Sequence, residues 1–359
     1  MIDSLGKISG DKPVLSASEA GSTPRSDKGD VAAIDQLRAI YNQMRAEVGK
    51  VIIGQEEVVE RLLICILARG HGLLMGVPGL AKTMIVNSLS QVMSLQFSRI
   101  QFTPDLMPSD ITGTDILQET DQPGRRAFVF VKGPVFANIV LADEINRTPP
   151  KTQSALLEAM QEHRVTVAGR FFPLPSPFFV LATQNPIEQE GTYALPEAQL
   201  DRFMFFIHVD YPTVEDERRI ARETTGGAPA ALKHLINAEQ IIGFQEVVQR
   251  VPVPDHIYDT AVDLVRMTRP KEEEAPDWIK KWVTWGAGPR AVQYLIRGAK
   301  AHAVLHGSYL VRSEDLEAVA QPVLTHRILT NFQAQAEGVT STFIVDKLLE
   351  EVRSETRRA

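Results

Sequence analysis

The sequence predicts an α/β fold: a parallel sheet with helices on both faces, followed by a smaller domain built from helices. Three observations lead to this prediction. The short apolar run Leu73-Leu74-Met75 enters a turn rich in Gly and Pro and then a helical pattern. Apolar strand patterns continue to alternate with helical ones as far as Tyr211-Pro212. Beyond that point the strand patterns stop, and helical periodicity continues from Glu215 to Arg353.

Changes in composition give the predicted domain boundaries. Residues 1–30 mix Ser, Gly, Pro, Asp and Lys with few large apolar side chains, so they cannot bury enough surface to offset the cost of ordering. We expect a disordered N-terminal tail there. Helical spacing begins at Val31, and the last strand pattern ends near Pro212. We therefore assign residues 31–212 to the α/β core and residues 213–359 to the C-terminal helical domain.

Five apolar segments predict the strands of the core. They are Leu73–Met75, Phe97–Phe102, Ala137–Ala142, Phe178–Thr183 and Phe203–Ile207. The third is apolar at every position except Asn138, as is typical of a central parallel strand that is buried on both faces. Helical patterns at residues 34–48 and 58–67 precede the first strand. Between Gln161 and Pro177 the pattern becomes that of a β-hairpin with the two-residue turn Ala168-Gly169, inserted into the alternating scheme.

Overall composition is that of an ordinary globular protein, with 44% hydrophobic and 23% charged residues. The net charge of −7 disfavours a globally basic surface for nucleic acid. No run approaches the roughly 20 apolar residues that span a bilayer, and residues 1–10 lack the apolar core of a signal peptide. We therefore expect a cytoplasmic protein without a membrane span. Its one cysteine, Cys65, lies among apolar residues and is expected to be buried.

The turn after the first strand is predicted to bind the phosphates of a nucleotide. It consists of Gly76, Val77, Pro78, Gly79, Leu80, Ala81, Lys82 and Thr83. Its glycines let backbone N–H groups surround the phosphates, while Lys82 would reach the β and γ oxygens and Thr83 would offer its hydroxyl to Mg²⁺. Ala81 stands where such loops usually have Gly. A merely structural Gly/Pro turn before an amphipathic helix would look similar.

Polar residues follow the other predicted strands. Asp143 and Glu144 end the third strand, where Asp143 would bind Mg²⁺ and Glu144 would orient the attacking water. Asn185 follows the fourth strand and would contact the γ-phosphate or that water. Arg202 precedes the fifth strand, too far from its own loop but within reach of a neighbour's nucleotide. Arg290, in Gly288-Pro-Arg290, begins a helix of the second domain; taken alone, such an arginine is usually a surface charge.

These segments together resemble the MoxR family of AAA+ ATPases. The matching stretches are 76–83, 141–162, 182–193, 195–203 and 288–291, in the family's order. The resemblance implies a P-loop AAA+ core and an all-helical lid domain. It also implies Walker A roles for Lys82 and Thr83, Walker B roles for Asp143 and Glu144, sensor 1 for Asn185, an arginine finger acting in trans for Arg202, and sensor 2 for Arg290. Gly54 and Gln55 match the stretch that lines the adenine pocket, and residues 108–113 with 124–131 resemble the helix-2 insert. In this family Ala is an accustomed residue at position 81.

The resemblance further implies ATP and Mg²⁺ as ligands and a ring-shaped homohexamer. Family members are chaperone-like remodellers that act on client proteins, often with a von Willebrand A domain partner, and help them mature or acquire a metal. Two other functions compete with this one. In a nucleic-acid motor Arg164 and Arg170 of the hairpin would bind a phosphate backbone, although the acidic balance makes nucleic acid unlikely. A slow scaffold would regulate a partner by binding alone, against which the intact Glu144 and Arg202 argue.

Two further patterns are interpreted as packing. His302 and His306 lie four residues apart on a predicted helix and could share a metal ion, but no third ligand stands nearby in the sequence and the neighbours are Ala, Val and Leu. Trp278, Trp282 and Trp285 recur at helical spacing, which is more typical of a core or interdomain anchor than of a binding site.

Overall fold

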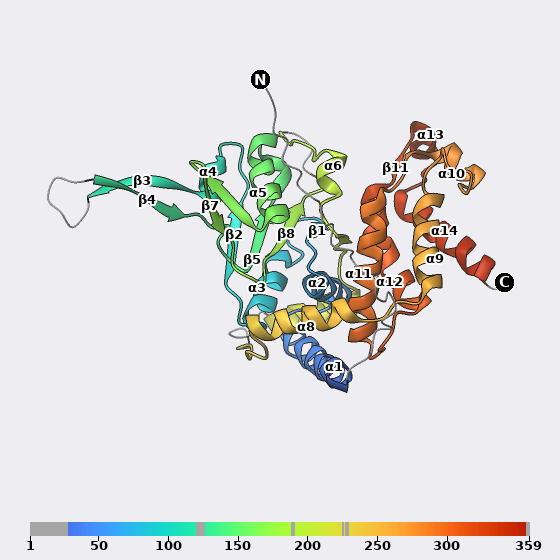
Figure 1. Cartoon of the computed structure of the whole chain (residues 1–359), viewed down its shortest axis with the longest axis horizontal. Coiled ribbons are helices and arrows are strands. Elements are labelled where there is room, and N and C mark those ends of the chain that lie inside the picture. The colour runs from blue at the N-terminus through green and yellow to red at the C-terminus, as the bar shows by residue number, and fades with distance from the viewer. Residues whose placement is uncertain (1–27, 120–125, 188–190, 225, 227–229, 357–359) are drawn as a thin grey trace, which may run out of the picture.

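The computed structural model describes residues 28–119, 126–187, 191–224, 226 and 230–356 (Figure 1). Most of the predicted tail, residues 1–27, lies outside this part. The helix α1 (Lys28–Val48) already begins at Lys28, so residues 28–30, which were assigned to the disordered tail, are helical. Asp30 in its first turn pairs with Arg250 of α8 (Ala238–Arg250), with 2.6 Å between Oδ1 and Nη2. This contact gives the helix start a partner that lies far away in the sequence.

A five-stranded parallel sheet forms the centre of the core, with the order β2-β5-β8-β1-β9. Its strands are β1 (Gly72–Met75), β2 (Phe97–Gln101), β5 (Ile139–Asp143), β8 (Phe179–Gln184) and β9 (Phe205–His208). The five predicted strands are therefore confirmed to within a few residues. Parallel strands start at one edge of the sheet and end at the other, so the segments that follow β1, β5 and β8 meet at the carboxyl edge.

Helices cover both faces of this sheet. Leu74 and Leu181 pack with α2 (Glu56–Leu67), α3 (Lys82–Val92) and α1 on one face. The neighbouring strand residues Leu73 and Val180 point to the other face, where they pack with α5 (Pro150–Glu162) and α4 (Pro108–Thr112). This alternation explains why the central strands are apolar at nearly every position.

Two antiparallel hairpins extend from the core. The strands β6 (Arg164–Val167) and β7 (Arg170–Pro173) form the predicted hairpin, and both turn residues have positive φ, 48° for Ala168 and 76° for Gly169. The strands β3 (Gly113–Glu119) and β4 (Arg126–Lys132) form a longer hairpin that projects far from the sheet (Figure 1). The short elements η1 (Ile145–Arg147) and α6 (Glu197–Leu200) complete the core.

Helices dominate the rest of the chain, as predicted. They are α7 (Val214–Thr224), α8, α9 (Asp255–Met267), α10 (Asp277–Trp282), α11 (Pro289–Leu305), α12 (Ser313–Leu324), α13 (Phe332–Ala336) and α14 (Ser341–Thr356), with the short turn η2 (Thr325–Arg327). One detail differs from the prediction, because β10 (Val283–Trp285) pairs with β11 (Leu329–Thr330). Two or three residues are too few to show a strand period. Trp285 consequently lies on a strand and is exposed, whereas Trp278 and Trp282 pack together on α10.

The helix α8 lies between the two parts of the chain. It packs against α1 and α2 of the core and also against α11 (Figure 1). Gln245 of α8 donates from Nε2 to the carbonyl of Ile66 at 2.7 Å. The boundary between residues 212 and 213 therefore stays a prediction based on composition. None of the helices in the described part of the chain is long and apolar enough to cross a bilayer.

Candidate functional site

A cavity of about 430 Å³ opens at the carboxyl edge of the sheet. It lies beyond the ends of β1, β5 and β8. The residues that line it are Pro78, Gly79, Leu80, Ala81, Lys82, Thr83, Met84, Arg99, Asp143, Glu144, Thr183, Gln184 and Asn185. The structure thus brings the predicted phosphate loop together with both predicted acids and Asn185. Open α/β sheets bind their ligands at this place.

The loop between β1 and α3 has the geometry of an anion cradle. Gly79 and Ala81 both have left-handed backbone, with φ of 88° and 54°. Ala81 is the N-cap of α3, so the N-terminus of that helix points at the cavity. A left-handed alanine costs about 1–2 kcal/mol, and strain of this kind tends to be kept at functional sites.

Lys82 is held inside the loop by its own backbone. Its Nζ donates to the carbonyls of Gly76 and Val77, the latter at 3.1 Å. Burial lowers the pKa of Lys82, while the charges of Asp143 and Glu144 act in the opposite direction. The ammonium group is therefore partly desolvated and faces acids across the cavity, where a phosphate would be a strong partner.

Both acids are oriented by neighbours that the sequence analysis did not single out. Asp143 accepts from Thr183 Oγ1 at 2.6 Å and forms an ion pair with Arg99 at 2.6 Å. Glu144 has left-handed backbone, with φ of 58°, and its N–H donates to the same Thr183 Oγ1 at 2.9 Å. Its carboxylate accepts from Gln101 at 2.8 Å and pairs with Arg147 at 2.9 Å. The carboxylates of Asp143 and Glu144 therefore contact different partners. This separation suits the two different roles predicted for them, metal binding and orientation of water.

Thr183 and Arg99 escaped the sequence analysis for different reasons. Thr183 is the last residue of the predicted fourth strand, so its place at a strand end was an available signal. Arg99 lies on β2, and only the order of the strands shows that β2 pairs with β5. Asn185 is buried, and its Oδ1 accepts from the N–H of Ile187 at 3.1 Å, which leaves its amide nitrogen for other partners.

Gly54, Gln55, Gly76 and Val77 do not line the cavity, although they support its surroundings. Gln55 donates from Nε2 to the carbonyl of Asp210 at 3.0 Å, which ties the start of α2 to the segment after β9. Gly54 has φ of 74°. A Cβ on Gly76 would lie 2.7 Å from the carbonyl oxygen of Val209, so only glycine fits there.

Arg202 and Arg290 lie at the opposite edge of the sheet. Because β9 runs parallel to β1 with Phe205 beside Gly72, Arg202 precedes the amino end of these strands, whereas the phosphate loop follows Met75. The length of β1 alone separates the two edges by roughly 10 Å. Arg202 donates to the carbonyl of Leu157 at 2.9 Å and lines a different cavity, of about 330 Å³. Arg290 pairs with Asp201 at 2.9 Å. The structure therefore does not bring either arginine to the phosphate loop of its own chain.

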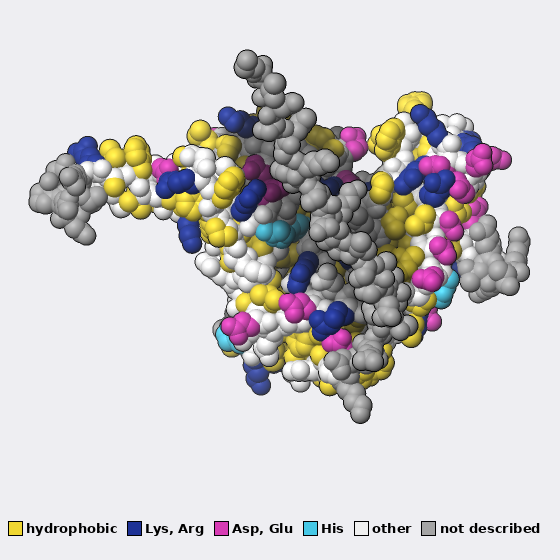
Figure 2. All heavy atoms as spheres, viewed as in Figure 1, with side chains coloured by type: hydrophobic (Ala, Val, Ile, Leu, Met, Phe, Trp, Pro, Cys, Tyr) yellow, Lys and Arg dark blue, Asp and Glu magenta, His cyan; other side chains and the backbone are white. Residues whose placement is uncertain are grey.

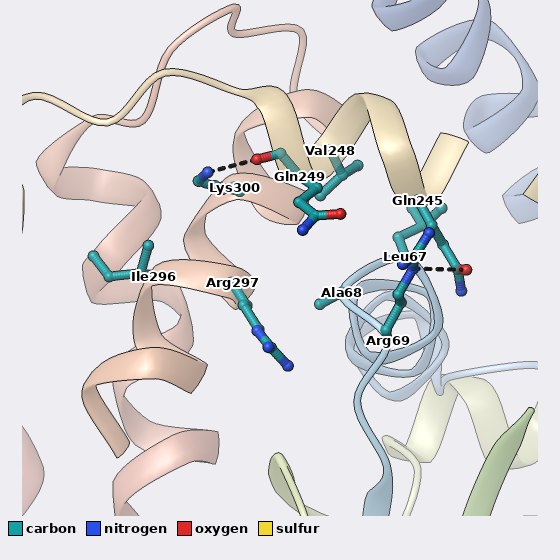
Figure 3. Close-up of a pocket in the computed structure, with 9 residues that line it drawn as sticks. All are labelled: Leu67, Ala68, Arg69, Gln245, Val248, Gln249, Ile296, Arg297 and Lys300. Carbon is teal, nitrogen blue, oxygen red and sulfur yellow. Dashed lines mark hydrogen bonds between the residues drawn. The ribbon is translucent and has the colours of Figure 1, made fainter. Parts of the chain in front are cut away.

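A third cavity, of about 240 Å³, lies where the end of α2, α8 and α11 meet (Figure 3). Arg69, Arg297 and Lys300 supply its charged side chains, and Arg297 extends from α11 toward the end of α2. Lys300 donates to the carbonyl of Gln249 at 2.7 Å, and burial lowers its pKa. None of the predicted site residues lines this cavity.

The chain is similar to known proteins over most of its length. A family model described as "ATPase family associated with various cellular activities (AAA)" matches residues 71–205, and one described as "AAA lid domain" matches residues 278–348. The chain is 44% identical to Chaperone MoxR1 of Mycobacterium tuberculosis over 330 residues, which are 92% of this chain and 85% of that protein. It is 28% identical to Protein MoxR of Methylorubrum extorquens over 83% of this chain and 90% of that protein. A crystal structure of a Cytophaga hutchinsonii protein proposed to be an ATPase superposes with a TM-score of 0.83 at 42% identity, covering 90% of this chain and 97% of that one.

Proposed function

Because the chain belongs to the MoxR family of AAA+ ATPases, we propose that it hydrolyses ATP and uses the reaction to remodel client proteins in a chaperone-like manner. One observation carries the proposal: Lys82, Asp143, Glu144 and Asn185 line one cavity at the end of a strained glycine-containing loop. The name of the 44% identical relative, Chaperone MoxR1, supports the chaperone part. ATP is abundant in the cytoplasm, so we propose that compartment.

The residues that line the cavity fit ATP and Mg²⁺. Thr83 and Asp143 supply the oxygen ligands that Mg²⁺ prefers, and the ion would neutralise charge on the β and γ phosphates. Lys82 exchanges its two carbonyl partners for phosphate oxygens. Thr183 holds Asp143 and the backbone of Glu144 together. Glu144 orients the attacking water, and Asn185 positions the same water or the γ-phosphate through its amide nitrogen.

We propose that Arg202 and Arg290 act on the nucleotide of a neighbouring subunit. Their distance from the loop of their own chain supports this role, since an arginine side chain reaches only about 7 Å from its Cα. A chain with its phosphate loop at one edge and its arginines at the other forms head-to-tail contacts, and such contacts close into a ring when the rotation allows. A homohexamer is the family's arrangement, and we propose it here.

The two hairpins are proposed to contact the client. The side chains of Leu117, Phe128 and Val131 on β3 and β4 are exposed, so the long hairpin carries apolar surface away from the core (Figure 2). It is also coupled to the shorter hairpin. Phe130 stacks on Phe172 with ring centroids 3.9 Å apart, and Arg170 pairs with Asp115. A motion of one hairpin is thereby transmitted to the other.

A nucleic-acid motor is less well supported. The two arginines that would bind a phosphate backbone already have partners, since Arg164 lies over the ring of Phe171 at 4.3 Å and Arg170 pairs with Asp115. By family resemblance we extend the proposal to a von Willebrand A domain partner and to the maturation of clients, including the insertion of a metal or cofactor.

The test is a mixing experiment with two inactive variants. Arg202→Ala keeps its own cavity intact, and Glu144→Gln keeps its arginine. If sites form between subunits and the subunits mix at random, one interface in four combines an intact cavity with an intact arginine, so an equimolar mixture should recover about a quarter of the wild-type rate. The matched control is Arg218→Ala, which removes an exposed arginine on α7 and should remain active. Two results together would refute the role of Arg202 in trans. The mixture would stay inactive, and the wild-type rate per subunit would not depend on protein concentration.

A further inference from the structure

Three potential metal ligands meet where the core packs against the C-terminal helices. His302 lies in the last turn of α11, His306 caps that helix, and Glu60 belongs to α2. One ligand atom from each of the three lies within 4.8 Å of those of the other two. In the sequence no third ligand lies near the two histidines, so their spacing alone does not predict a metal site. The fold supplies that ligand from 246 residues away.

The distance between His306 and Glu60 suits a small tetrahedral ion. His306 Nε2 lies 3.1 Å from Glu60 Oε1. Around Zn²⁺, with bonds of about 2.0–2.2 Å, tetrahedral ligand atoms are roughly 3.3 Å apart. The rings of His302 and His306 are stacked, with centroids 4.2 Å apart and planes at 29°. Modest side-chain rotations would bring the histidine nitrogens and the carboxylate onto one ion, since two histidines four residues apart share one face of a helix.

The surroundings of His302 prepare it to bind a metal. Its Nδ1 lies 2.8 Å from Oδ1 of Asp315, a fully buried carboxylate on α12 that also accepts from the N–H of Arg312 at 2.8 Å. Asp315 is the acceptor at this contact, so Nδ1 of His302 carries the proton. This leaves the lone pair on Nε2, which has no hydrogen-bond partner in the described part of the chain.

Glu60 is oriented in the same way. Tyr41 of α1 donates from Oη to Glu60 Oε2 at 2.6 Å, which turns Oε1 toward His306. Hydrogen-bonded partners of this kind typically set the orientation of metal ligands.

We propose that Glu60, His302 and His306 bind one Zn²⁺ or a similar divalent ion, with a fourth position open to water. Two histidines and one glutamate are a donor set that zinc accepts readily. The ion would join α2 of the core to α11, which pack side by side (Figure 1). Since α2 leads into β1 and the phosphate loop, the ion would fix the C-terminal helices relative to the strand that carries the nucleotide site. It is a resident ion, distinct from any metal delivered to a client.

The test measures zinc binding by the full-length protein. The chain is stripped with a chelator, desalted and titrated with Zn²⁺ by calorimetry in excess Mg²⁺, which would occupy the proposed site at Thr83 and Asp143. We expect one tightly bound ion per chain and a higher Tm of the zinc-loaded protein. Co²⁺ in place of Zn²⁺ should show the intense visible absorption of a tetrahedral site. Glu60→Gln and His306→Ala should each weaken zinc binding at least tenfold and abolish the Tm shift.

Two further variants make the result specific. His256→Ala removes an exposed histidine on α9 and should bind zinc like the wild type. Glu60→Gln keeps a side chain that can bond to Tyr41 and His306, so a loss of affinity without loss of circular dichroism reports ligation and not folding. The proposal fails if the wild type binds no zinc at one ion per chain. It also fails if Glu60→Gln and His306→Ala bind zinc as tightly as the wild type does.

Discussion

Lowering the pH should destabilise the folded chain through His71, which lies between α2 and β1. This side chain is buried, its Nδ1 accepts from the N–H of Val180 at 3.0 Å, and its Nε2 faces the carbonyl of Met160 at 3.2 Å. The ring is therefore neutral, with its proton on Nε2. A second proton on Nδ1 would point at the N–H of Val180. Burial, aided by the nearby His163, lowers the pKa of His71 from 6.5 to about 4.

Proton linkage gives the direction and the size of the change in the free energy of unfolding with pH. Between pH 6.5 and about 4 the unfolded chain binds a proton at His71 that the folded chain does not, so stability falls as the pH falls. For these two pKa values, the free energy of unfolding decreases by about 0.8 kcal/mol at pH 6 and about 2 kcal/mol at pH 5, relative to pH 8. His326 adds a loss of the same sign, because burial and the adjacent Arg327 hold its pKa well below the usual value.

The assay is urea unfolding of the wild type and of His71→Gln at pH 8, 6 and 5. Glutamine keeps a donor and an acceptor but does not titrate in this range. Its absolute stability is irrelevant, since the measurement compares the two pH dependences. The wild type should lose about 2 kcal/mol more than the variant between pH 8 and pH 5. Equal losses of unfolding free energy in the two proteins would show that folding does not lower the pKa of His71, and would refute the reasoning.

Two other substitutions test the site and the attachment of the C-terminal helices. Thr183→Val removes the hydroxyl that joins Asp143 to the backbone of Glu144, so kcat should fall roughly tenfold or more. Thr183→Ser, which keeps the hydroxyl, should stay close to the wild type, and an equal loss in both variants would exclude this role. Arg327 is buried and donates to the carbonyl of Phe203 at 2.7 Å, while its partner Asp201 also pairs with Arg290. Arg327→Met therefore leaves a buried carbonyl without its donor and should cost about 1–3 kcal/mol of unfolding free energy in urea. Arg297→Met, at an exposed position, should cost less than about 0.5 kcal/mol, and similar costs for the two arginines would contradict the account.

The sequence predicted the core well because its local patterns coincide with its global arrangement. Each central strand is a short apolar run, and the phosphate loop and the acids directly follow such runs. The carboxyl edge of a parallel sheet then brings them together without further information. The hairpin at residues 164–173 was likewise predicted from its own turn residues, Ala168 and Gly169.

What was missed depends on contacts between distant segments. Arg99 reaches Asp143 only because β2 lies next to β5, an order that no local pattern reveals. Glu60 joins His302 and His306 only through the packing of α2 on α11. The start of α1 at residues 28–30 is stabilised by the distant Arg250, which pairs with Asp30. Local composition does not show this contact, and residues 28–30 were therefore assigned to the tail. The assignment of Arg202 to a neighbour's site stays a prediction, because it concerns a second chain.

Side chains of the C-terminal helices and of η2 hold the segment that carries Arg202. Asp201 accepts from Arg290 at 2.9 Å and from Arg327 at 2.8 Å, and Tyr294 donates from Oη to the carbonyl of Arg202 at 3.1 Å. A rotation of these helices would therefore pull on the backbone of residues 201 and 202, from which the side chain of Arg202 extends. In the proposed ring, the lid position of one subunit would set the hydrolysis rate at the adjacent site. That influence would pass around the ring in a single direction, from the owner of the arginine to the holder of the nucleotide.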